Sequence, residues 1–473
     1  MRVPTLLPAV KTGLSVFLVG VMGLLATGCA SSTSQATIYP IRVWRYNQDV
    51  DPLRTVLNQF QGDYPNTVVT YENKSLDSYE LNSLSSLASQ TGPELWSFPN
   101  DWMGDEQSRL AIVPPDFFGP LKDNNGANAA AKIKQLYTAD IANTLVGNDG
   151  NLYGFATNFD LLTLYYNDEL FSQGVSNFQK TLGDSYDDTQ YRPVQQLLSS
   201  PPATWSQVLQ QIPYLTQKNG QTITTSAIAL GTADNLPAAE DTLALLMYQN
   251  GTDITSSDHT RVLFNTQQNT PSGAIVRPGE KALSFFTSFA QPNSPNYTWN
   301  PSLPQALDAF GQGKVAMVLA YKDFGKKLEA KYPQMKFQTA PAPQINITDK
   351  AVNFGRYSID TVTKAASNPN LALQLLYQID KTDSASTLAS ESSMISPLVA
   401  SLQQDNHDTS KQVLNARTLY KKNHTQFDAD FLQMIRDVSQ NGASASGAMD
   451  VAAQKINDLL TPTIAPPSAS LNP

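Results

Sequence analysis

The alternation of strand-like and helix-like segments over residues 38–98 constrains the fold of this chain more than any other feature of its sequence. Short apolar, β-branched runs alternate with segments whose apolar residues recur at helical spacing. The pattern predicts strands at 41–44, 68–71 and 94–98 and helices at 51–60 and 76–88. Such connections join neighbouring parallel strands through right-handed crossovers, and sheets built in this way bind ligands beyond the carboxyl ends of their strands. We therefore expect an α/β fold with its site in the loops after the first and third strands.

Aromatic and short polar residues gather on those loops and on one later strand. They are Tyr46 and Asn47, then Asn100, Asp101 and Trp102, then Asn158, Phe159 and Asp160. Sugar rings pack their C–H faces on aromatic rings, and their hydroxyls bond to carboxylates and to Asn, so this mixture suits a sugar. An ordinary solvated loop explains Asp101 and Trp102 equally well, and the pattern alone leaves both explanations open.

The single cysteine, Cys29, follows a segment typical of a secretory signal. Arg2 and Lys11 make a basic start, residues 12–28 are uncharged, and small residues come directly before the cysteine. The apolar stretch is shorter than the roughly 20 residues that span a bilayer. LATGC resembles a bacterial lipobox, which implies cleavage after residue 28, fatty acids such as palmitate on Cys29 and a flexible tether behind it. A secreted protein with a buried cysteine and a short uncleaved anchor are the alternatives.

Composition narrows the classes of function. The 473 residues include 32 Lys and Arg against 41 Asp and Glu with no dense basic run, which argues against a nucleic-acid partner. One cysteine excludes an internal disulfide framework and any multi-cysteine metal site. The common catalytic motifs are absent from the sequence, so we expect no enzyme, no cofactor and no metal. A glycosidase needs only two carboxylates in space, so a surface glycosidase or polysaccharide-processing lipoprotein stays open as an alternative.

Seven segments carry a resemblance to a known family. In chain order they are IRVW, FQGDYPNTVVTY, TGPELWSFPNDWMG, GNDGNLYGFATNFDLLTLYYNDELF, PPATW, ALDAFGQGKVAMVLAYKD and FQTAPAPQ. Each is weak alone, but in this order and behind a lipobox the chain resembles the extracellular solute-binding proteins of carbohydrate ABC importers, the group that includes the maltose-binding protein. The resemblance implies an α/β, two-lobed periplasmic-binding-protein-like fold of type II, whose lobes are joined by hinge strands and close on a solute.

The resemblance also implies how the chain divides. We expect a signal peptide at 1–28, a lipidated cysteine and tether at 29–37, and a disordered tail at 461–473. The amino-terminal lobe is expected to comprise 38–155 plus 318–358, and the carboxy-terminal lobe 156–317 plus 359–460, with crossings near 155–156, 317–318 and 358–361.

Candidate binding residues follow from the same resemblance. It places Asp101 and Trp102 on a sugar-contacting loop and Asp160 where a carboxylate touches sugar. Tyr321 or Lys322 takes the position of a cleft aromatic, although the tryptophan that maltose-type proteins carry near there is missing. Arg356 either faces the ligand or braces the hinge, and Trp299 is a candidate by its loop position. The full predicted set is Tyr46, Asn47, Asp101, Trp102, Phe159, Asp160, Trp299, Tyr321, Lys322 and Arg356.

Together these expectations describe a monomeric receptor held by its lipid on the extracytoplasmic face of the cell membrane. It captures a carbohydrate, an oligosaccharide in our interpretation, and delivers it to the permease subunits of an ABC importer. A receptor for peptides or charged solutes is a further alternative. If Lys322 and Arg356 both point into the cleft, an acidic or phosphorylated sugar becomes a better candidate than a neutral one.

Overall fold

A computed structural model of the chain describes residues 37–46, 51–118, 128–183, 187–220, 222–270, 272–346, 350–381, 394–404 and 408–461. The expected signal peptide, Cys29, Asn47 and the tail beyond residue 461 lie outside these residues. Within the described residues, no helix combines the length and the apolarity that crossing a bilayer requires.

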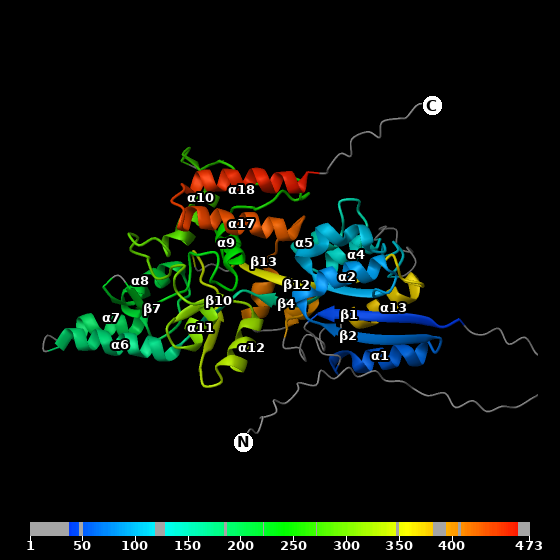
Figure 1. Ribbon diagram of the computed structural model, residues 1–473, viewed down its shortest axis with the longest axis horizontal. Coiled ribbons are helices and arrows are strands. Elements are labelled where there is room, and N and C mark those ends of the chain that lie inside the picture. The colour runs from blue at the N-terminus through cyan, green and yellow to red at the C-terminus, as the bar shows by residue number, and fades with distance from the viewer. Residues whose placement is uncertain are drawn as a thin grey trace, which may run out of the picture. The chain divides into compact units, whose positions relative to one another are not determined.

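The predicted β-α-β-α-β start of the chain is confirmed. Strand β1 (Tyr39–Tyr46), helix α1 (Asp51–Asp63), strand β2 (Thr67–Lys74), helix α2 (Tyr79–Ala88) and strand β3 (Leu95–Pro99) follow one another in that order. Strand β1 pairs in parallel with β2 on one side and with β3 on the other. Figure 1 shows the blue β1 and β2 side by side, with α1 against them. The carboxyl ends of β1 and β3 therefore meet at one edge of the sheet, as the sequence predicted.

One long strand organises the rest of this sheet. Strand β12 (Asn353–Val362) runs antiparallel to β3 and to β4 (Gly154–Leu161), and its first residues pair in parallel with β13 (Ala416–Arg417). The chain then leaves β4 for β5 (Thr163–Tyr166), the central strand of a separate sheet between β10 (Met317–Ala320) and β11 (Gln338–Pro341). Strands β4 and β12 thus connect the main sheet to the remainder of the fold.

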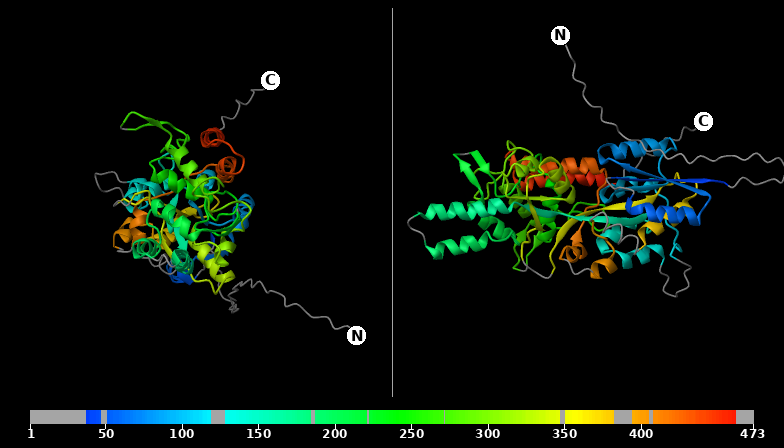
Figure 2. Two further views of the ribbon diagram at one scale, coloured as in Figure 1. Left: turned by 90° about the vertical axis from the view of Figure 1, so that its left-hand side faces the viewer. Right: turned by 90° about the horizontal axis from the view of Figure 1, so that it is seen from below.

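Helices surround both sheets. After η2 (Asn100–Trp102) come α3 (Met103–Glu106), α4 (Ala129–Leu136), α5 (Ala139–Leu145), α6 (Asp168–Leu182), α7 (Asp188–Leu197), α8 (Trp205–Leu215), α9 (Ala239–Gln249), α10 (Pro278–Ser288), α11 (Ala306–Gly311), α12 (Lys322–Lys331), α13 (Pro369–Asp380), α15 (Val399–Gln404), α16 (Asp408–Leu414), α17 (His424–Ser439) and α18 (Ala445–Leu460). Figure 2 shows α6 and α7 projecting together beyond the sheets, and α17 beside α18. Two short hairpins, β6 (Gln217–Asn219) with β7 (Thr222–Thr225) and β8 (Gln268–Asn269) with β9 (Ile275–Val276), complete the described strands.

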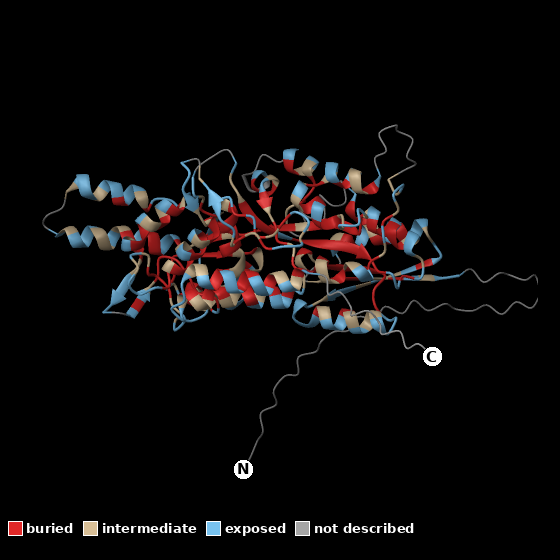
Figure 3. Cartoon of the chain, turned by 90° about the horizontal axis from the view of Figure 1, so that it is seen from above, coloured by how far each residue is buried: buried red, intermediate tan, exposed pale blue. Residues whose placement is uncertain are grey.

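The buried apolar residues form two main cores. The amino-terminal core draws on residues within 41–161 and 357–416, and the carboxy-terminal core on residues within 162–354 and 419–460. A third cluster, around Trp299 and Phe310, packs beside Tyr165 in the carboxy-terminal half of the fold. Figure 3 shows the buried segments following the strands at the centre, with exposed helix faces outside them.

The chain passes from one core to the other at points that differ from the expected crossings. Packing passes from one core to the other between Leu161 and Leu162, between Phe354 and Tyr357, and between Ala416 and Leu419. We expected residues 318–358 in the amino-terminal lobe and 359–460 in the carboxy-terminal lobe. The buried apolar residues within 318–354 instead pack in the carboxy-terminal half, and those within 359–416 pack in the amino-terminal core. The reason is that β10 and β11 both pair with β5, which carries the segment into the smaller sheet.

Candidate ligand site

The turn after β3 carries two of the predicted residues. Asp101 accepts a hydrogen bond from the Lys421 ammonium, with Nζ 3.1 Å from Oδ2. Trp102 is buried, and its ring stacks on the imidazole of His424 with centroids 5.3 Å apart. Asp101 is therefore an ion-pair partner at the edge of the sheet, while Trp102 is packed beneath it and joins the loop to the start of α17.

Strand register explains how Asp160 meets Arg356. The two residues lie opposite each other on β4 and β12, just before an irregularity at Tyr357 shifts the pairing. Arg356 Nη2 lies 3.6 Å from Asp160 Oδ2, and the backbone N–H of Lys322 donates to the same oxygen at 3.2 Å. Burial raises the pKa of Asp160 even though Arg356 and the Lys322 N–H lower it. This carboxylate caps the first turn of α12 and leaves little room for another anion there.

Tyr321 and Arg356 form one unit with two further acids. The Arg356 guanidinium lies over the Tyr321 ring, 3.9 Å from its centroid, and donates to Asp323 at 2.8 Å. The Tyr321 hydroxyl donates to Asp241 Oδ2 at 2.8 Å. Burial alone would lower the pKa of Arg356, but Tyr321 and the neighbouring carboxylates raise it further, so the guanidinium stays charged.

Lys421 is a central residue that the sequence did not reveal. Its side chain is only 4% exposed, and its ammonium pairs with Asp101 and, at 2.6 Å, with Asp428 on α17. Burial would lower the pKa of Lys421, but the surrounding carboxylates raise it well above its usual value. Gly104 makes the approach possible, because a Cβ at that position would collide with the Lys421 carbonyl oxygen.

Two acids in the first turn of α9 complete the group. Asp241 accepts the hydrogen bond from the Tyr321 hydroxyl, and Glu240 is the residue before Asp241. Burial, with the Asp241 charge adding to it, raises the pKa of Glu240 to about 7. We call the residues that meet here the seam cluster, because they come from the turn after β3, from β4, α9, β12 and α17, and from α12 and the residues just before α12 and α17. Its members are Asp101, Asp160, Glu240, Asp241, Tyr321, Asp323, Arg356, Lys421 and Asp428.

A second polar contact lies beside the seam cluster. His424 Nδ1 is 2.8 Å from Asp105 Oδ2, its Nε2 is 3.3 Å from Glu80, and the backbone N–H groups of Asn423 and His424 donate to the Asp105 carboxylate. Burial opposes protonation of this imidazole, but Asp105 and Glu80 outweigh it and raise the pKa of His424. We call this contact the His424 clamp, since it ties α17 to α2 and α3.

Of the other predicted residues, Tyr46 lies close enough to Arg356, Asp101 and Asp160 for their charges to act on its hydroxyl, whereas Phe159 and Trp299 have different surroundings. The Tyr46 hydroxyl bonds to Ser358 at 2.9 Å, and burial raises its pKa to about 12. Phe159 is buried and stacks on Tyr357 with centroids 5.9 Å apart, as core residues do. Trp299 is 1% exposed and donates its indole N–H to Asn235 at 3.0 Å in the third cluster. The structure brings Asp101, Asp160, Tyr321, Lys322 and Arg356 together, whereas the printed contacts of Phe159 and Trp299 are those of core packing.

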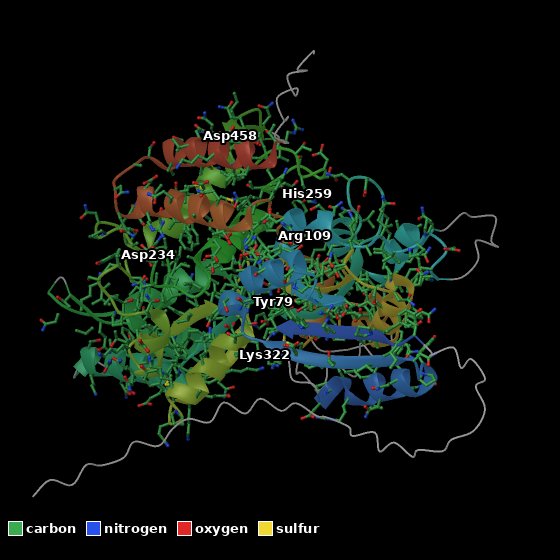
Figure 4. The ribbon with its side chains drawn as sticks, turned by 45° about the vertical axis from the view of Figure 1, so that its right-hand side comes forward. Tyr79, Arg109, Asp234, His259, Lys322 and Asp458 are labelled. Carbon is green, nitrogen blue, oxygen red and sulfur yellow. The ribbon has the colours of Figure 1, made fainter. Side chains whose placement is uncertain are left out.

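A cavity of about 350 Å³ lies near the other end of α9. Asp140, Tyr248, His259, Arg417 and Tyr420 are among its lining residues, and none of the predicted site residues belongs to it. Arg417 pairs there with both Asp140 and Asp253, whereas the two ring nitrogens of His259 have no hydrogen-bond partner among the described residues. We take the seam cluster as the candidate ligand site because the predicted site residues meet there and not at this cavity. Figure 4 labels His259, beside the cavity, and Lys322, at the start of α12.

The described residues contain no group of three or more His, Cys, Asp or Glu side chains arranged to hold a metal ion. The clustered carboxylates are instead separated by Lys421, Arg356 and the Tyr321 ring. The geometry provides charged hydrogen-bond partners and aromatic surface, which are the means of binding a polar solute.

Comparison with known proteins identifies the family. Residues 47–376 match the model of the bacterial extracellular solute-binding proteins, which is well over half of the chain. The chain belongs to this family. A search of curated protein sequences finds no match.

Solved structures show the same fold. A cyclo/maltodextrin-binding protein in complex with maltotetraose has a TM-score of 0.64 and 16% identity, covering 92% of this chain and 100% of its own. A cyclic alpha-maltosyl-1,6-maltose binding protein from Arthrobacter globiformis has a TM-score of 0.65 at 16% identity, over 89% and 99% of the two chains. The sugar-binding protein MalE from the phytopathogen Xanthomonas citri has a TM-score of 0.62 at 16% identity, over 89% and 97%. The predicted two-lobed α/β periplasmic-binding-protein fold is confirmed.

Proposed function

We propose that this family member captures a carbohydrate between its two lobes and delivers it, chemically unchanged, to the permease of an ABC importer. The observation that carries the proposal is the seam cluster, because its polar groups converge from elements of both cores in a chain of the solute-binding family. The similar structures named above are sugar-binding proteins by their own descriptions. In this proposal the amino-terminal lobe holds the core of 41–161 and 357–416, and the carboxy-terminal lobe holds 162–354 and 419–460.

Asp101, Asp160 and Tyr321 are the proposed contacts. Two carboxylates accept hydrogen bonds from sugar hydroxyls, and an aromatic ring packs on the sugar face. Lys322 and Arg356 border the same place, and Lys421 fixes the position of Asp101. Tyr46, the last residue of β1, and Asn47, which lies outside the described residues, complete the proposed set.

Titration with neutral oligosaccharides, maltotetraose included, tests the proposal. We expect saturable binding by isothermal titration calorimetry, and we expect Asp160→Asn to weaken it about tenfold, since it loses one charge-assisted hydrogen bond. Asp234→Asn is the matched control, because Asp234 pairs with Arg436 elsewhere in the fold. Recovery of the sugar intact after long incubation separates capture from hydrolysis. Release of a reducing end would favour the glycosidase alternative.

Anchoring through Cys29 is part of the same proposal. The lipobox motif LATGC and the apolar segment before it support cleavage after residue 28 and acylation of the new terminus. Two or more acyl chains hold a protein at a membrane where a single chain does not. Labelling cells with an alkyne fatty acid tests this: the wild type should be labelled, and Cys29→Ser should not.

A further inference from the structure

A groove lies between helices α7 and α8, in the carboxy-terminal half of the fold. Its volume is about 680 Å³, which falls within the range of roughly 300 to 1,000 Å³ that small-molecule sites occupy. Figure 1 shows α7 and α8 on the left-hand side, away from β1 on the right. No member of the seam cluster lines the groove, so the two are separate places on the protein. We call it the α7–α8 groove.

Among the described residues, no charged side chain lines the α7–α8 groove. Its walls consist mainly of amides, hydroxyls, prolines and one tyrosine. The amides and serines come from both helices and from the loop between them, and they are Gln196, Gln207, Gln210, Gln211, Ser199 and Ser200. A phosphate, a carboxylate or an ammonium would lose water on entering this groove and would find no opposite charge in its walls. The lining therefore favours an uncharged polar ligand.

Gln211 is buried at this groove with half of its amide unused. The residue is 1% exposed, and its Nε2 donates to the carbonyl oxygens of Leu197 at 2.9 Å and Ser200 at 3.3 Å. Because carbonyl oxygens only accept, these two bonds fix which end of the amide is the nitrogen. Among the described residues, the Gln211 Oε1 has no donor. A buried acceptor without a donor is costly, and this one belongs to a residue that lines a cavity, so a ligand with a donor would fit here.

Gln207 offers the opposite group one turn earlier on the same face of α8. Its Oε1 accepts from the backbone N–H groups of Ala203 at 2.7 Å and Thr204 at 3.2 Å, in the capping box that begins the helix. Its Nε2 has no acceptor within the described part of the chain. Helix α8 thus carries an unused donor at Gln207 and an unused acceptor at Gln211. A hydroxyl group both accepts and donates, so it matches both.

A sugar combines the features that this groove requires. Its hydroxyls suit the amides and serines, and the C–H faces of its rings pack on apolar surface, which here comes from Tyr214, Pro193, Pro201 and Pro213. A proline-rich peptide would also cover that surface, but proline has no N–H to donate to Gln211. We propose that the α7–α8 groove is a second site, which binds a neutral oligosaccharide outside the seam cluster. This inference goes beyond the proposed function and does not depend on it.

Hydrogen exchange followed by mass spectrometry locates the binding. The wild type is mixed in turn with maltotetraose, cellotetraose and mannotetraose as neutral probes, and with chitosan tetraose and tetragalacturonate as charged ones. A proline-rich peptide with the sequence of residues 461–473 is a further probe. A few exposed hydrogen bonds support a Kd of about 1 mM, so each probe is used at about 10 mM.

We expect at least one neutral sugar to slow exchange within residues 194–214 about tenfold, because exchange there requires opening of the groove and the bound sugar opposes that opening. The charged sugars should slow it less than about threefold, since they lose hydration without gaining an ion pair. The peptide should not slow it.

Variants assign the protection to the groove. Gln196→Ala with Gln210→Ala removes two exposed amides from its walls and keeps both helices, because alanine is the best helix former. The sugar should then bind about tenfold more weakly, which leaves about twofold protection. Gln173→Ala with Gln195→Ala is the matched control and should keep the full protection, since these glutamines are exposed on α6 and α7 but do not line the groove.

Gln211→Met tests the buried amide directly and should also weaken the protection. Unfolding midpoints show whether this variant keeps its fold, and if it does not, the double alanine variant decides the question. Asp160→Asn changes the seam cluster alone and should leave the protection of 194–214 as in the wild type.

The outcomes separate this inference from the proposed function, because residues 100–105 and 158–162 report on the seam cluster in the same experiment. Protection of these residues without protection of 194–214 overturns the inference and leaves the proposed function standing. Protection of 194–214 that charged sugars or the peptide match, or that survives in Gln196→Ala with Gln210→Ala, also overturns the inference. Protection of 194–214 alone supports it and contradicts capture between the lobes. If no neutral sugar protects either region, both proposals have failed.

Discussion

The two ends of helix α9 show two ways of joining the halves of this protein. Near its carboxyl end, Arg417 lies over the Tyr248 ring at 4.3 Å and pairs with Asp140 at 3.2 Å and Asp253 at 3.1 Å. At its first turn, Glu240 and Asp241 face the seam cluster, where carboxylates outnumber the cations. The same helix thus borders partly exposed ion pairs around Arg417 at one end and more deeply buried charges around Lys421 at the other.

The difference separates a structural joint from a binding site. Asp140 also accepts hydrogen bonds from the backbone and side chain of Thr418, so the groups around Arg417 satisfy one another. A buried surplus of charge is costly, and a protein keeps one where a function compensates for the cost. The buried charges of the seam cluster therefore suit the proposed binding site, whereas water reaches the charges around Arg417.

Replacing Lys421 should have the largest effect on stability. In Lys421→Met, the carboxylates of Asp101 and Asp428 lose their ammonium while they stay largely buried. Breaking a buried pair in this way costs about 3 kcal/mol. Urea-induced unfolding at pH 7 measures the loss, and the loss should be smaller at pH 5, because the raised pKa of Asp428 lets that carboxyl take up a proton. A loss of stability below about 1 kcal/mol would show that water stabilises the two carboxylates when the ammonium is absent.

Replacing Arg417 should cost less than replacing Lys421, which sharpens the comparison between the two ends of α9. The Arg417 and Asp253 side chains are 39% and 58% exposed, so water stabilises the acids that Arg417→Met leaves behind. We expect a loss of about 1 kcal/mol in the same unfolding experiment. Arg192→Met, which breaks an exposed pair with Asp188 on α7, is the control and should change stability by at most about 0.5 kcal/mol. Equal losses in Lys421→Met and Arg417→Met would contradict the distinction drawn here.

The strands and helices at the start of the chain could be predicted, because neighbouring residues determine them. The β-α-β-α-β start is confirmed because periodicity over a few residues decides strand or helix. Asp101 and Asp160 were predicted from the polar and aromatic residues of the loops and from the family resemblance. Tyr321, Lys322 and Arg356, which the structure brings near them, were predicted after the resemblance was recognised. The position of Asp101 directly after β3 could be predicted because the strand pattern and the loop after it are local features of the sequence.

Long-range contacts could not be predicted from the sequence. Lys421 lies 320 residues from Asp101, in a segment with no pattern that marks it. Trp299 looked like a cleft residue because it follows Asn and Tyr in a loop, yet a hydrogen bond to Asn235, 64 residues away, holds it in a core. The acids of α9 could be noticed in the sequence, because two adjacent carboxylates begin a helix that is otherwise mostly apolar. Acids at that position also occur where they only interact with the helix dipole, so the pattern alone does not indicate a site.

The smallest effect is expected for the His424 clamp, and it depends on pH. The folded pKa of His424 lies above its ordinary value of 6.5, so its contribution to stability is complete below about pH 6.5 and is lost as the pH rises through the folded value. Asp105 has a lowered pKa, and its contribution is lost only when the pH falls through that lower value. His424→Phe keeps a ring beside Trp102 but removes the charge that faces Asp105, Glu80 and Asp101.

Unfolding of the wild type and His424→Phe, compared from pH 5.5 to 8.5, isolates this contribution. Glu106, whose pKa burial raises to about 7, and Glu240 also make stability fall with rising pH. Glu240 does so alike in both proteins, whereas the His424 charge lowers the pKa of Glu106, so the difference between the proteins includes this coupling. We expect the stability difference between the two proteins to shrink by up to about 1 kcal/mol toward the alkaline end. A constant difference across this range would mean that the imidazole acts by packing alone.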